Sequence, residues 1–534
     1  MIHLLKEQLS NLKFLFKYYL NIRQNLSSQL KGKTREVKKS KTVLVPLIET
    51  NHYQHFQILI LSKALQIRGA KVKIIVCDGY LDGCEIKSVK NKKYINPCFK
   101  CKFNLKKTHP FFDLDTIKIG DIIDTKTKLK IKEFAKNNFL KEKITYKDMD
   151  ITQSINDSIL RYFYGKIPDE SNVVNEIKFK HTLTAITSHE IARLLNINYN
   201  PDIILNNMNV YSAWDSFYKY FKSNNTESFV ISMAAYDFNK IKVNLFEVFE
   251  SRKRFTKFLL SRNKRPLDKS ELKELNFFLN KRKNGQSDIF KKYNYFSFDS
   301  SDAIQKLNLK KSNKNIFIFT NILWDIGISE NNGIFKDILD WVYKTIEFVK
   351  ERNDLTLYIK THPAEEFDSQ KSKMTVYEHT IRKFKKLPKN VCFILPSMKI
   401  NTYLLFPYID LGIIYSGTLG LEMLLEKIPV VTVSNAPYSG LDFSYEPQSN
   451  EEYFKCLIEE RKFKNEKYDD IRLFAFFYFI KFHLPWNLTK KVFADNFNGF
   501  TFDSLDDITP GKNKYLDHLT NYILDSKNNC IENW

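Results

Sequence analysis

The chain has 534 residues, of which 43% are hydrophobic and 27% charged, and its 84 Lys and Arg against 61 Asp and Glu give a formal net charge of +23. This composition excludes wholesale disorder, collagen-like repeats and a small disulfide-stapled fold, and the length predicts two large domains or three of middling size. The basic excess favours an anionic partner such as nucleic acid, an acidic membrane surface or a phosphorylated substrate, although a simply solvated basic surface also explains it.

No apolar run approaches the about 20 residues that a membrane-spanning helix needs. The best candidate, Leu473–Ile480, is short and is bracketed by Arg472 and Lys481. Lysines interrupt the first hydrophobic segment and no small-residue cleavage site follows it, so we expect no signal peptide. The seven cysteines, an odd number, fit a reducing compartment. We therefore expect a cytoplasmic protein.

Residues 1–41 stand apart as a basic amphipathic segment. Apolar residues recur there at steps of three and four, from Leu5 to Leu26, which is typical of one helix face. Ten basic residues oppose only Glu7 and Glu36. Such a helix can lie in an anionic membrane surface, and it can equally pack on the domain that follows.

A first α/β domain is predicted over residues 42–240, with helical insertions. Thr42–Leu47 reads as a strand, Ile58–Leu65 as a helix and Ala70–Val76 as a second strand, which is a βαβ unit with a parallel sheet. In such a sheet, the loops at the carboxyl ends of strands line the ligand crevice. The loop from Ile48 to His55 is therefore a candidate part of a site.

The stretch that follows, residues 241–310, is predicted to be a basic helical junction. Lys and Arg are dense in Arg252–Lys283, with Phe255, Phe258 and Leu259 interleaved. Basic residues mixed with aromatic ones suggest nucleic-acid binding. No recognition motif accompanies them, so we expect no nucleic-acid partner.

A second α/β domain is predicted over residues 311–485, followed by a tail, residues 486–534, that can pack back on the first domain. Short β-rich runs alternate there with helical patterns, as in a doubly wound sheet. Two such domains in one chain place a cleft between them. The predicted strands are Ile316–Thr320, Leu355–Ile359, Val391–Leu395, Leu411–Tyr415 and Pro429–Val433.

Two loops of the second domain carry the sharpest chemical signals. In the first, a buried strand runs into Ser416, Gly417 and Thr418 and a helix begins at once, where backbone N–H groups, hydroxyls and the helix dipole favour a phosphate. Glu422, one turn into that helix, could accept hydrogen bonds from ribose hydroxyls. The alternative is an ordinary capped helix on a tight turn.

The second loop follows the strand Leu355–Ile359. It carries Lys360, a point charge for a pyrophosphate, and His362, which could donate a hydrogen bond or shuttle a proton. Pro363 would stiffen the loop. The alternative is a surface loop with a solvated lysine. Because both loops should open on one crevice, together they predict a phosphate-binding site.

With these residues in place, the second half resembles the C-terminal domain of the bacterial capsule polysaccharide biosynthesis family, which includes the Kdo-type capsule glycosyltransferases. The first half is similar to that family's opening βαβ unit, so the resemblance covers about residues 42–80 and 316–485. The matching segments are Phe319–Asn321, Trp324-Asp325, Lys360–Glu365, Ile400–Tyr403, Tyr415–Glu422, Pro429–Val431, Phe474–Phe479, Arg68–Ala70 and Val76–Gly79.

The resemblance implies a GT-B architecture, in which two Rossmann-like domains face each other across a cleft. The nucleotide-sugar donor would sit on the C-terminal domain and the acceptor on the N-terminal one, without a metal or other cofactor. Donor-site roles are implied for a set of residues. Lys360 and His362 would neutralise phosphates, Ser416, Gly417 and Thr418 would cradle them, Glu422 would hold the ribose, and Asn321 lies in a matched segment of the same site.

An inverting transfer also needs a base to take the acceptor hydroxyl proton. The candidates on predicted crevice loops are Glu49, His52, His55 and Asp78, of which Glu49 and His52 are preferred, with His362 as a third catalytic candidate. Whether the reaction retains or inverts the anomeric configuration stays open.

The sequence offers two kinds of candidate metal site. Asp113/Asp115 and Asp148/Asp150 match the pair that a metal-dependent GT-A enzyme uses, but neither follows an obvious buried strand. The cysteines Cys84, Cys98 and Cys101 could bind structural zinc with Cys77 nearby, although a single C-x2-C is only half of a zinc site. Neither site is favoured.

The sequence thus predicts a cytoplasmic enzyme, peripheral on the inner face of the plasma membrane, that adds a sugar to a lipid-linked or growing surface polysaccharide. Three alternatives remain: a polyol-phosphate transferase, a sugar-nucleotide epimerase, and a non-catalytic binding protein of polysaccharide export. No Walker, HExxH, GxSxG or GxGxxG motif points to another class.

Overall fold

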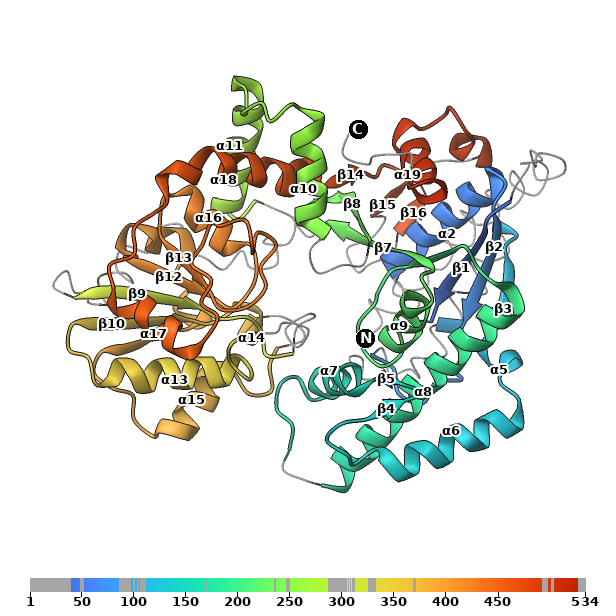
Figure 1. Ribbon diagram of the computed structural model, residues 1–534, viewed down its shortest axis with the longest axis horizontal. Helices are drawn as coiled ribbons and strands as arrows, with labels where there is room; N and C mark the ends of the chain where they lie inside the picture. Colours follow the sequence, from blue (N-terminus) through green and yellow to red (C-terminus); the bar gives the residue numbers. More distant parts are fainter. Residues whose placement is uncertain are drawn as a thin grey trace, which may run out of the picture.

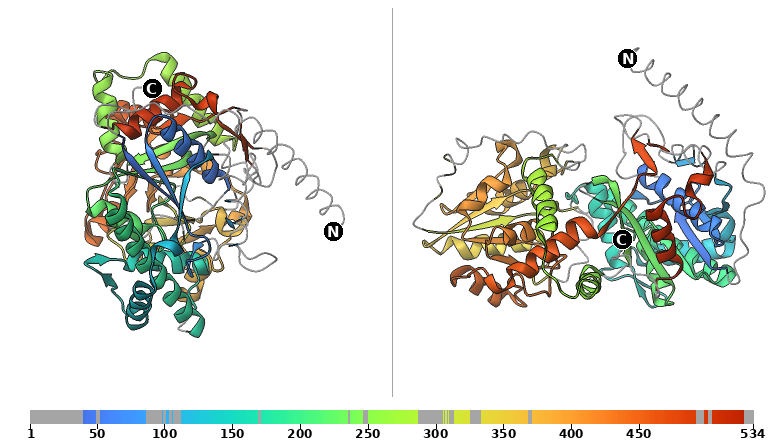
Figure 2. Two further views of the ribbon diagram at one scale, coloured as in Figure 1. Left: turned by 90° about the vertical axis from the view of Figure 1, so that its right-hand side faces the viewer. Right: turned by 90° about the horizontal axis from the view of Figure 1, so that it is seen from above.

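The computed structural model shows two lobes side by side, joined along one edge (Figures 1 and 2). It describes the chain in segments, and predictions that fall elsewhere, such as the helix within residues 1–39 and the role of Glu49, lie outside the described residues. The described residues are 40–48, 52–85, 98, 101–102, 105, 112–168, 171–234, 237–245, 250–286, 305, 307, 309, 313–324, 333–367, 371–491, 498–500 and 504–526.

The first lobe is built on a seven-stranded sheet of order β14-β8-β7-β6-β1-β2-β3. Five of its strands pair in parallel, because the helical crossover connections return each strand in the same direction. Two antiparallel strands, β8 and β14, extend one edge. The strands are β1 (Thr42–Leu47), β2 (Lys71–Val76), β3 (Asp115–Lys118), β6 (Ile203–Asn206), β7 (Glu227–Ala234), β8 (Asp237–Leu245) and β14 (His483–Pro485).

Helices cover both faces of this sheet. On one face, α2 (His52–Ile67) and the late helix α19 (Lys514–Leu524) share a core with Val43, Val45 and Leu47. On the other face, four helices bury Leu44 and Ile75. These four are α6 (Thr125–Asn138), α7 (Thr152–Phe163), α8 (Asn172–Tyr199) and α9 (Asp215–Ser223), and the shorter elements nearby are α5 (Ile119–Ile122), β4 (Thr145–Tyr146) and β5 (Met149–Asp150).

The second lobe has a five-stranded, wholly parallel sheet of order β11-β10-β9-β12-β13. Counted along the chain, the order is 3-2-1-4-5, and the five parallel strands of the first lobe repeat it. Both lobes are therefore doubly wound, which confirms the predicted fold class. The strands are β9 (Lys314–Phe319), β10 (Leu355–Lys360), β11 (Val391–Ile394), β12 (Leu411–Ile414) and β13 (Val430–Thr432).

The second sheet is also covered on both faces, by two separate apolar clusters. One face packs against α13 (Ile338–Lys350), α15 (Val376–Phe384) and α17 (Asn450–Ile458). The other face packs against α10, α11, α16, α18 and η5. Their bounds are α10 (Glu250–Ser261), α11 (Lys269–Lys283), α16 (Leu419–Leu425), α18 (Tyr468–Phe476) and η5 (Phe477–Lys481), with α14 (Ala364–Phe367) at the sheet's end.

The chain passes between the lobes after β8 and again after η5, which leads into β14 of the first sheet (Figure 1). Beyond Pro485, the helix α19 lies on the first lobe, where it packs on α2 and its Asp517 forms an ion pair with Arg68. The segment predicted as a junction from residue 241 begins inside β8, and its two helices belong to the second lobe. Further small elements are η3 (Thr402–Tyr408), β15 (Thr489–Lys491) and β16 (Asn498–Phe500).

A second contact joins the lobes through the loop that follows β9. Trp324 packs edge-to-face on Tyr164, at the end of α7, with ring centroids 5.4 Å apart. The Arg161 guanidinium lies over the Trp324 ring at 4.4 Å, and the Lys373 N–H donates to the Tyr164 carbonyl. The first lobe therefore holds the loop that begins at the end of β9.

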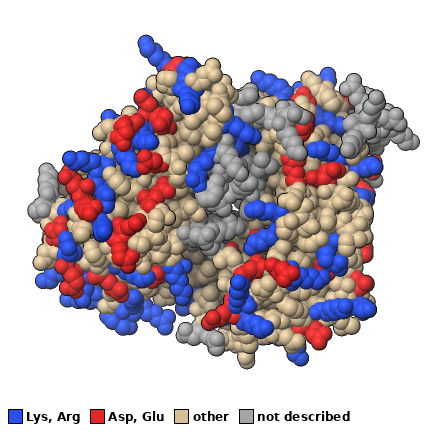
Figure 3. All heavy atoms as spheres, viewed as in Figure 1, with Lys and Arg blue, Asp and Glu red and all other residues tan. Residues whose placement is uncertain are grey.

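On the face shown in Figure 3, the basic side chains do not gather in a single patch. In the view of Figure 3, Lys and Arg are interspersed with Asp and Glu over both lobes. Within the described residues, no helix is long and apolar enough to cross a membrane.

Candidate functional site

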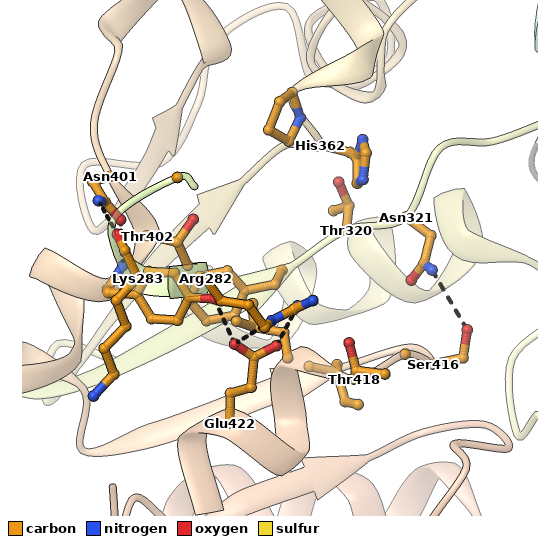
Figure 4. Close-up of a pocket in the computed structure, with 17 residues that line it drawn as sticks. Arg282, Lys283, Thr320, Asn321, His362, Asn401, Thr402, Ser416, Thr418 and Glu422 are labelled. Atoms are coloured by element: carbon orange, nitrogen blue, oxygen red, sulfur yellow. Dashed lines mark hydrogen bonds and ion pairs between the residues drawn. The ribbon is translucent and has the colours of Figure 1, made fainter. Parts of the chain in front are cut away.

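A cavity of about 260 Å³ opens at the carboxyl ends of β9 and β12, the point where the strand order of the second sheet reverses. Ligands of open α/β sheets bind at such switch points, because the loops on either side diverge and leave a crevice. Figure 4 shows the side chains that surround it. They are Arg282, Lys283, Gly285, Phe319, Thr320, Asn321, His362, Pro363, Asn401, Thr402, Tyr403, Ile414, Ser416, Gly417, Thr418, Leu419 and Glu422.

The loop after β12 forms one wall and leads straight into α16. Gly417 has a φ of +115°, a conformation that L side chains rarely adopt. Gly420 is fixed for another reason, because a Cβ there would lie 1.9 Å from the Tyr438 hydroxyl. Close packing on buried Tyr438 therefore sets the position of α16 and of the Ser416–Thr418 backbone.

The loop after β9 forms the opposite wall. The Thr320 N–H donates to the Lys360 carbonyl at 3.1 Å, which continues the pairing of the two strands by one residue. The Asn321 amide donates to the Ser416 hydroxyl in a long hydrogen bond of 3.5 Å. The predicted donor-site residues Asn321 and Ser416 are therefore brought together across the switch point.

His362 lies on the loop after β10 and lines the cavity, next to Thr320 in Figure 4. Its Nδ1 accepts a hydrogen bond from the Ala364 N–H at 3.1 Å, so Nδ1 carries no proton in this arrangement. The neutral imidazole must then carry its proton on Nε2. This tautomer makes the ring a hydrogen-bond donor through Nε2.

Lys360, predicted to neutralise phosphates, is not among the residues that line the cavity. It is the last residue of β10, in register with Phe319, and is only 3% exposed. Removal of its ammonium from water lowers the pKa of Lys360 to about 8. The structure therefore places this residue in the sheet and not on the cavity surface.

Glu422 does line the cavity, but its carboxylate is engaged in a buried network. Oε1 accepts from Nη2 of Arg282 at 2.7 Å, and Oε2 accepts from Nε at 3.3 Å and from the Tyr403 hydroxyl. Glu422 is 3% exposed and Arg282 is 6% exposed. Burial and the Glu422 carboxylate raise the pKa of Tyr403 well above its usual value, so the phenol stays a donor. The sequence interpretation treated Glu422 as open for ribose and did not foresee these partners.

Arg282 and Lys283 also line the cavity, which the sequence reasoning did not foresee. They come from the last turn of α11, about 140 positions before α16, and reach the cavity because α11 packs on α18 and η5. The Asn401 amide fixes this helix end by donating to the Lys283 carbonyl at 3.1 Å. The density of basic residues in Arg252–Lys283 was the only signal, and it did not reveal which of them faces the site.

The base candidates of the first lobe are placed unevenly. His52 is described only as the first residue of α2. His55 is buried, with Phe56 edge-on to its ring. Asp78 lies 3.5 Å from the Lys102 ammonium and 3.9 Å from that of Lys118. Neither His55 nor Asp78 is among the residues that line the cavity of the second lobe.

The carboxylate pairs considered as metal ligands have other partners. Asp115 forms an ion pair with Lys73, and Asp150 accepts from the Thr152 N–H at 2.9 Å. In the part of the chain that the structure describes, no group of three or more His, Cys, Asp and Glu side chains is arranged to hold a metal ion. Within that part, Cys84, Cys98 and Cys101 form no disulfide, and the zinc alternative stays a prediction.

No family model and no curated protein matches the chain, whereas solved structures do. Two are KpsC β-Kdo transferases from Thermosulfurimonas dismutans: the 2,4 transferase is 12% identical, covers 58% of this chain and 88% of its own, and has a TM-score of 0.35. The 2,7 transferase is 11% identical over 58% and 85%, with a TM-score of 0.33. A Neisseria meningitidis UDP-GlcNAc 2-epimerase is 12% identical over 83% and 99%, with a TM-score of 0.23. Likeness at this level concerns the fold and says nothing of the substrate.

Proposed function

We propose that the chain is a glycosyltransferase that moves a sugar from a nucleotide-sugar donor to a lipid-linked or growing capsule-type polysaccharide. One observation carries the proposal: donors of hydrogen bonds from four separate segments converge on one cavity at a topological switch point. Arg282 comes from α11, His362 from the loop after β10, Asn321 from the loop after β9, and Ser416 and Thr418 from the loop after β12.

This arrangement suits a reaction whose leaving group is an anion. When the bond from the sugar to the nucleotide breaks, negative charge grows on the phosphate. Fixed donors that already face this position stabilise the transition state more than the ground state, because they need no reorganisation. The Nε2–H of His362 and the hydroxyls of Ser416 and Thr418 can donate, and the Arg282 guanidinium supplies positive charge.

The acceptor would bind on the first lobe, with its reacting hydroxyl directed across the cleft. A base there takes the hydroxyl proton as the sugar is transferred. Glu49 and His52 remain the proposed bases, since both follow β1, the middle one of the five parallel strands of the first sheet. Alternatively, His362 on the donor side takes part directly in catalysis.

Incubating the purified protein with a panel of nucleotide sugars, with and without polysaccharide primers, tests this proposal. Acceptor-dependent release of free nucleotide and growth of the primer are expected. Conversion of the sugar without an acceptor would instead identify an epimerase, and transfer of a polyol phosphate would identify the CDP-linked alternative. A folded sample that neither binds nor converts any of the donors would overturn the proposal and favour a non-catalytic binding protein.

We further propose that the protein docks on anionic membrane through α10 and α11. Residues 250–283 hold 12 Lys and Arg against 4 Asp and Glu, a net charge of +8. On the same two helices, Leu260 is 63% exposed and Phe277 is 61% exposed. Exposed apolar side chains among basic ones match the boundary between lipid headgroups and acyl chains.

Vesicle sedimentation tests the docking. Wild type should pellet with vesicles of phosphatidylglycerol and stay in the supernatant with phosphatidylcholine. Replacing Leu260 and Phe277 by Ser should weaken the binding several-fold. Equal behaviour of both proteins on both lipids would contradict the proposed surface.

A further inference from the structure

Arg282 occupies an unusual position for an arginine. It is almost fully buried at the wall of the cavity described above, and it reaches that wall from a helix outside the doubly wound sheet. Its guanidinium lies directly above the Glu422 carboxylate (Figure 4). The aromatic rings of Phe278 and Phe479 lie 5.9 and 5.5 Å from its Cζ.

Stability alone is a poor reason for this pair. Removing two charges from water is expensive, and buried ion pairs can often be replaced by apolar residues of similar volume without loss of stability. A buried pair that lines a cavity has a second possible use, because the charge that is hidden from bulk water is still presented to a ligand. A low local dielectric strengthens its attraction for an anion.

The hydrogen bonds within the pair indicate different roles for Arg282 and Glu422. Glu422 engages Nε and Nη2 of Arg282, which form one edge of a planar group with five N–H donors. The same carboxylate also accepts from the Tyr403 hydroxyl. Glu422 therefore serves to hold the guanidinium in place. The planar guanidinium of an arginine can donate to two phosphate oxygens at once.

We propose that Arg282 is a phosphate-binding residue for the nucleotide donor and that Glu422 is a positioning residue, which holds the guanidinium in place and does not bind ribose. This inference rests on the proposed function, since it concerns the same cavity. It assigns the principal cationic contact to the end of α11 and replaces the role that the sequence suggested for Glu422.

Lys283 offers a matched control. It is the next residue of α11, lines the same cavity and is also basic, but it forms an ion pair with Glu426 and is much more exposed. Neutralising it changes the net charge of the protein by the same amount as neutralising Arg282. A general electrostatic effect would therefore appear in both variants, and a specific contact only in one.

The experiment measures nucleotide binding by calorimetry with wild type and the variants Arg282→Gln, Arg282→Lys, Glu422→Gln and Lys283→Gln. Wild type is first titrated with CMP, UDP and GDP. The nucleotide that binds is then compared with its 2′-deoxy form in every variant. Circular dichroism and thermal unfolding establish that each variant is folded, and Arg282→Lys keeps the buried charge if Arg282→Gln does not fold.

Loss of a charge-assisted phosphate contact predicts about 10- to 100-fold weaker binding for Arg282→Gln. Arg282→Lys should recover only part of the loss, because it lacks the fork, and Lys283→Gln should stay within about threefold of wild type. Glu422→Gln should weaken both nucleotide forms equally and leave their affinity ratio unchanged. Combining it with Arg282→Gln should add little, since both changes act on one contact.

Two results would overturn the inference while the proposed function stands. One is a folded Arg282→Gln, or failing that Arg282→Lys, that binds as tightly as wild type. The other is a preference for ribose over deoxyribose that Glu422→Gln abolishes, which would return Glu422 to the ribose. If wild type binds none of the three nucleotides, the proposed function and this inference both fail.

Discussion

The two lobes share a strand order but differ at their switch points. In the second lobe, the loops beyond β9 and β12 surround a cavity whose wall holds a buried ion pair, Arg282–Glu422. In the first lobe, β6 ends in the neutral amides Asn206 and Asn207, both buried. The side-chain atoms of Asn206 make no hydrogen bond in the structure as described.

This difference shows that topology decides where a site can lie, and side chains decide what it can bind. A doubly wound sheet opens a crevice at its switch point whatever the sequence. A fixed charge at that crevice suits a phosphate, whereas unpartnered amides suit a neutral hydroxyl-rich ligand, because their unmade hydrogen bonds are available only to a polar molecule. The predictions below test this division.

The largest effect is expected from Glu422→Ala. The change leaves the buried Arg282 guanidinium without its counter-charge, which should lower the free energy of unfolding of the second lobe by about 3–5 kcal/mol. Denaturant unfolding measures this loss. Glu426→Ala is the control, because its ion pair with Lys283 is partly exposed and should contribute less than about 1 kcal/mol. Equal losses would show that the buried pair is not special.

Low pH should destabilise the protein through a buried histidine of the first lobe. Burial lowers the pKa of His181 to about 3, so this ring stays neutral in the folded protein while its ordinary pKa of about 6.5 applies after unfolding. Below pH 6.5, the unfolded state then binds more protons, and stability must fall as the pH falls towards 3. Each pH unit is equivalent to about 1.4 kcal/mol, so about 2 kcal/mol is lost between pH 6.5 and 5.

His181→Gln isolates this effect, since Gln can still bond to the Ser212 hydroxyl that lies 2.8 Å from Nδ1. Its unfolding free energy should depend less steeply on pH in the same window. Chemical denaturation at several pH values measures both slopes, and parallel curves would contradict the assignment.

Asn206→Leu should stabilise the protein, whereas most core substitutions destabilise it. Because the buried amide makes no hydrogen bond, its removal should raise the free energy of unfolding by about 1 kcal/mol. If the amide serves the acceptor, transfer to the polysaccharide should fall in the same variant. Asn390→Leu is the control: that amide donates to the carbonyls of Val349, Arg352 and Leu355, so its loss should destabilise the protein.

The smallest effect concerns the contact between the lobes. Arg161→Ala removes the guanidinium from the Trp324 ring and should cost about 0.5–1 kcal/mol of stability. Arg472→Ala, which removes a similar contact with Tyr468 within the second lobe, should leave the interlobe contact unchanged. Protease susceptibility of the loops that join the lobes should rise only in Arg161→Ala.

Much of the second lobe was readable because its signals are local. Short apolar runs followed by small residues locate strands and their loops, and parallel pairing then requires that loops such as those of His362 and Ser416 open at one edge. The structure brings Asn321, His362, Ser416, Gly417, Thr418 and Glu422 to the same cavity. The direction of a side chain was less predictable from the sequence. For this reason the sequence did not reveal that Lys360 is buried in the sheet.

The sequence by itself determined the two doubly wound lobes, since hydrophobic periodicity and turn residues act over a few positions. Only the tertiary structure decided that the end of α11 forms a wall of the cavity, that Arg282 meets Glu422, and that α19 returns to α2. These contacts join residues more than a hundred positions apart. They depend on how packed faces orient whole helices, and no local pattern of residues records that orientation.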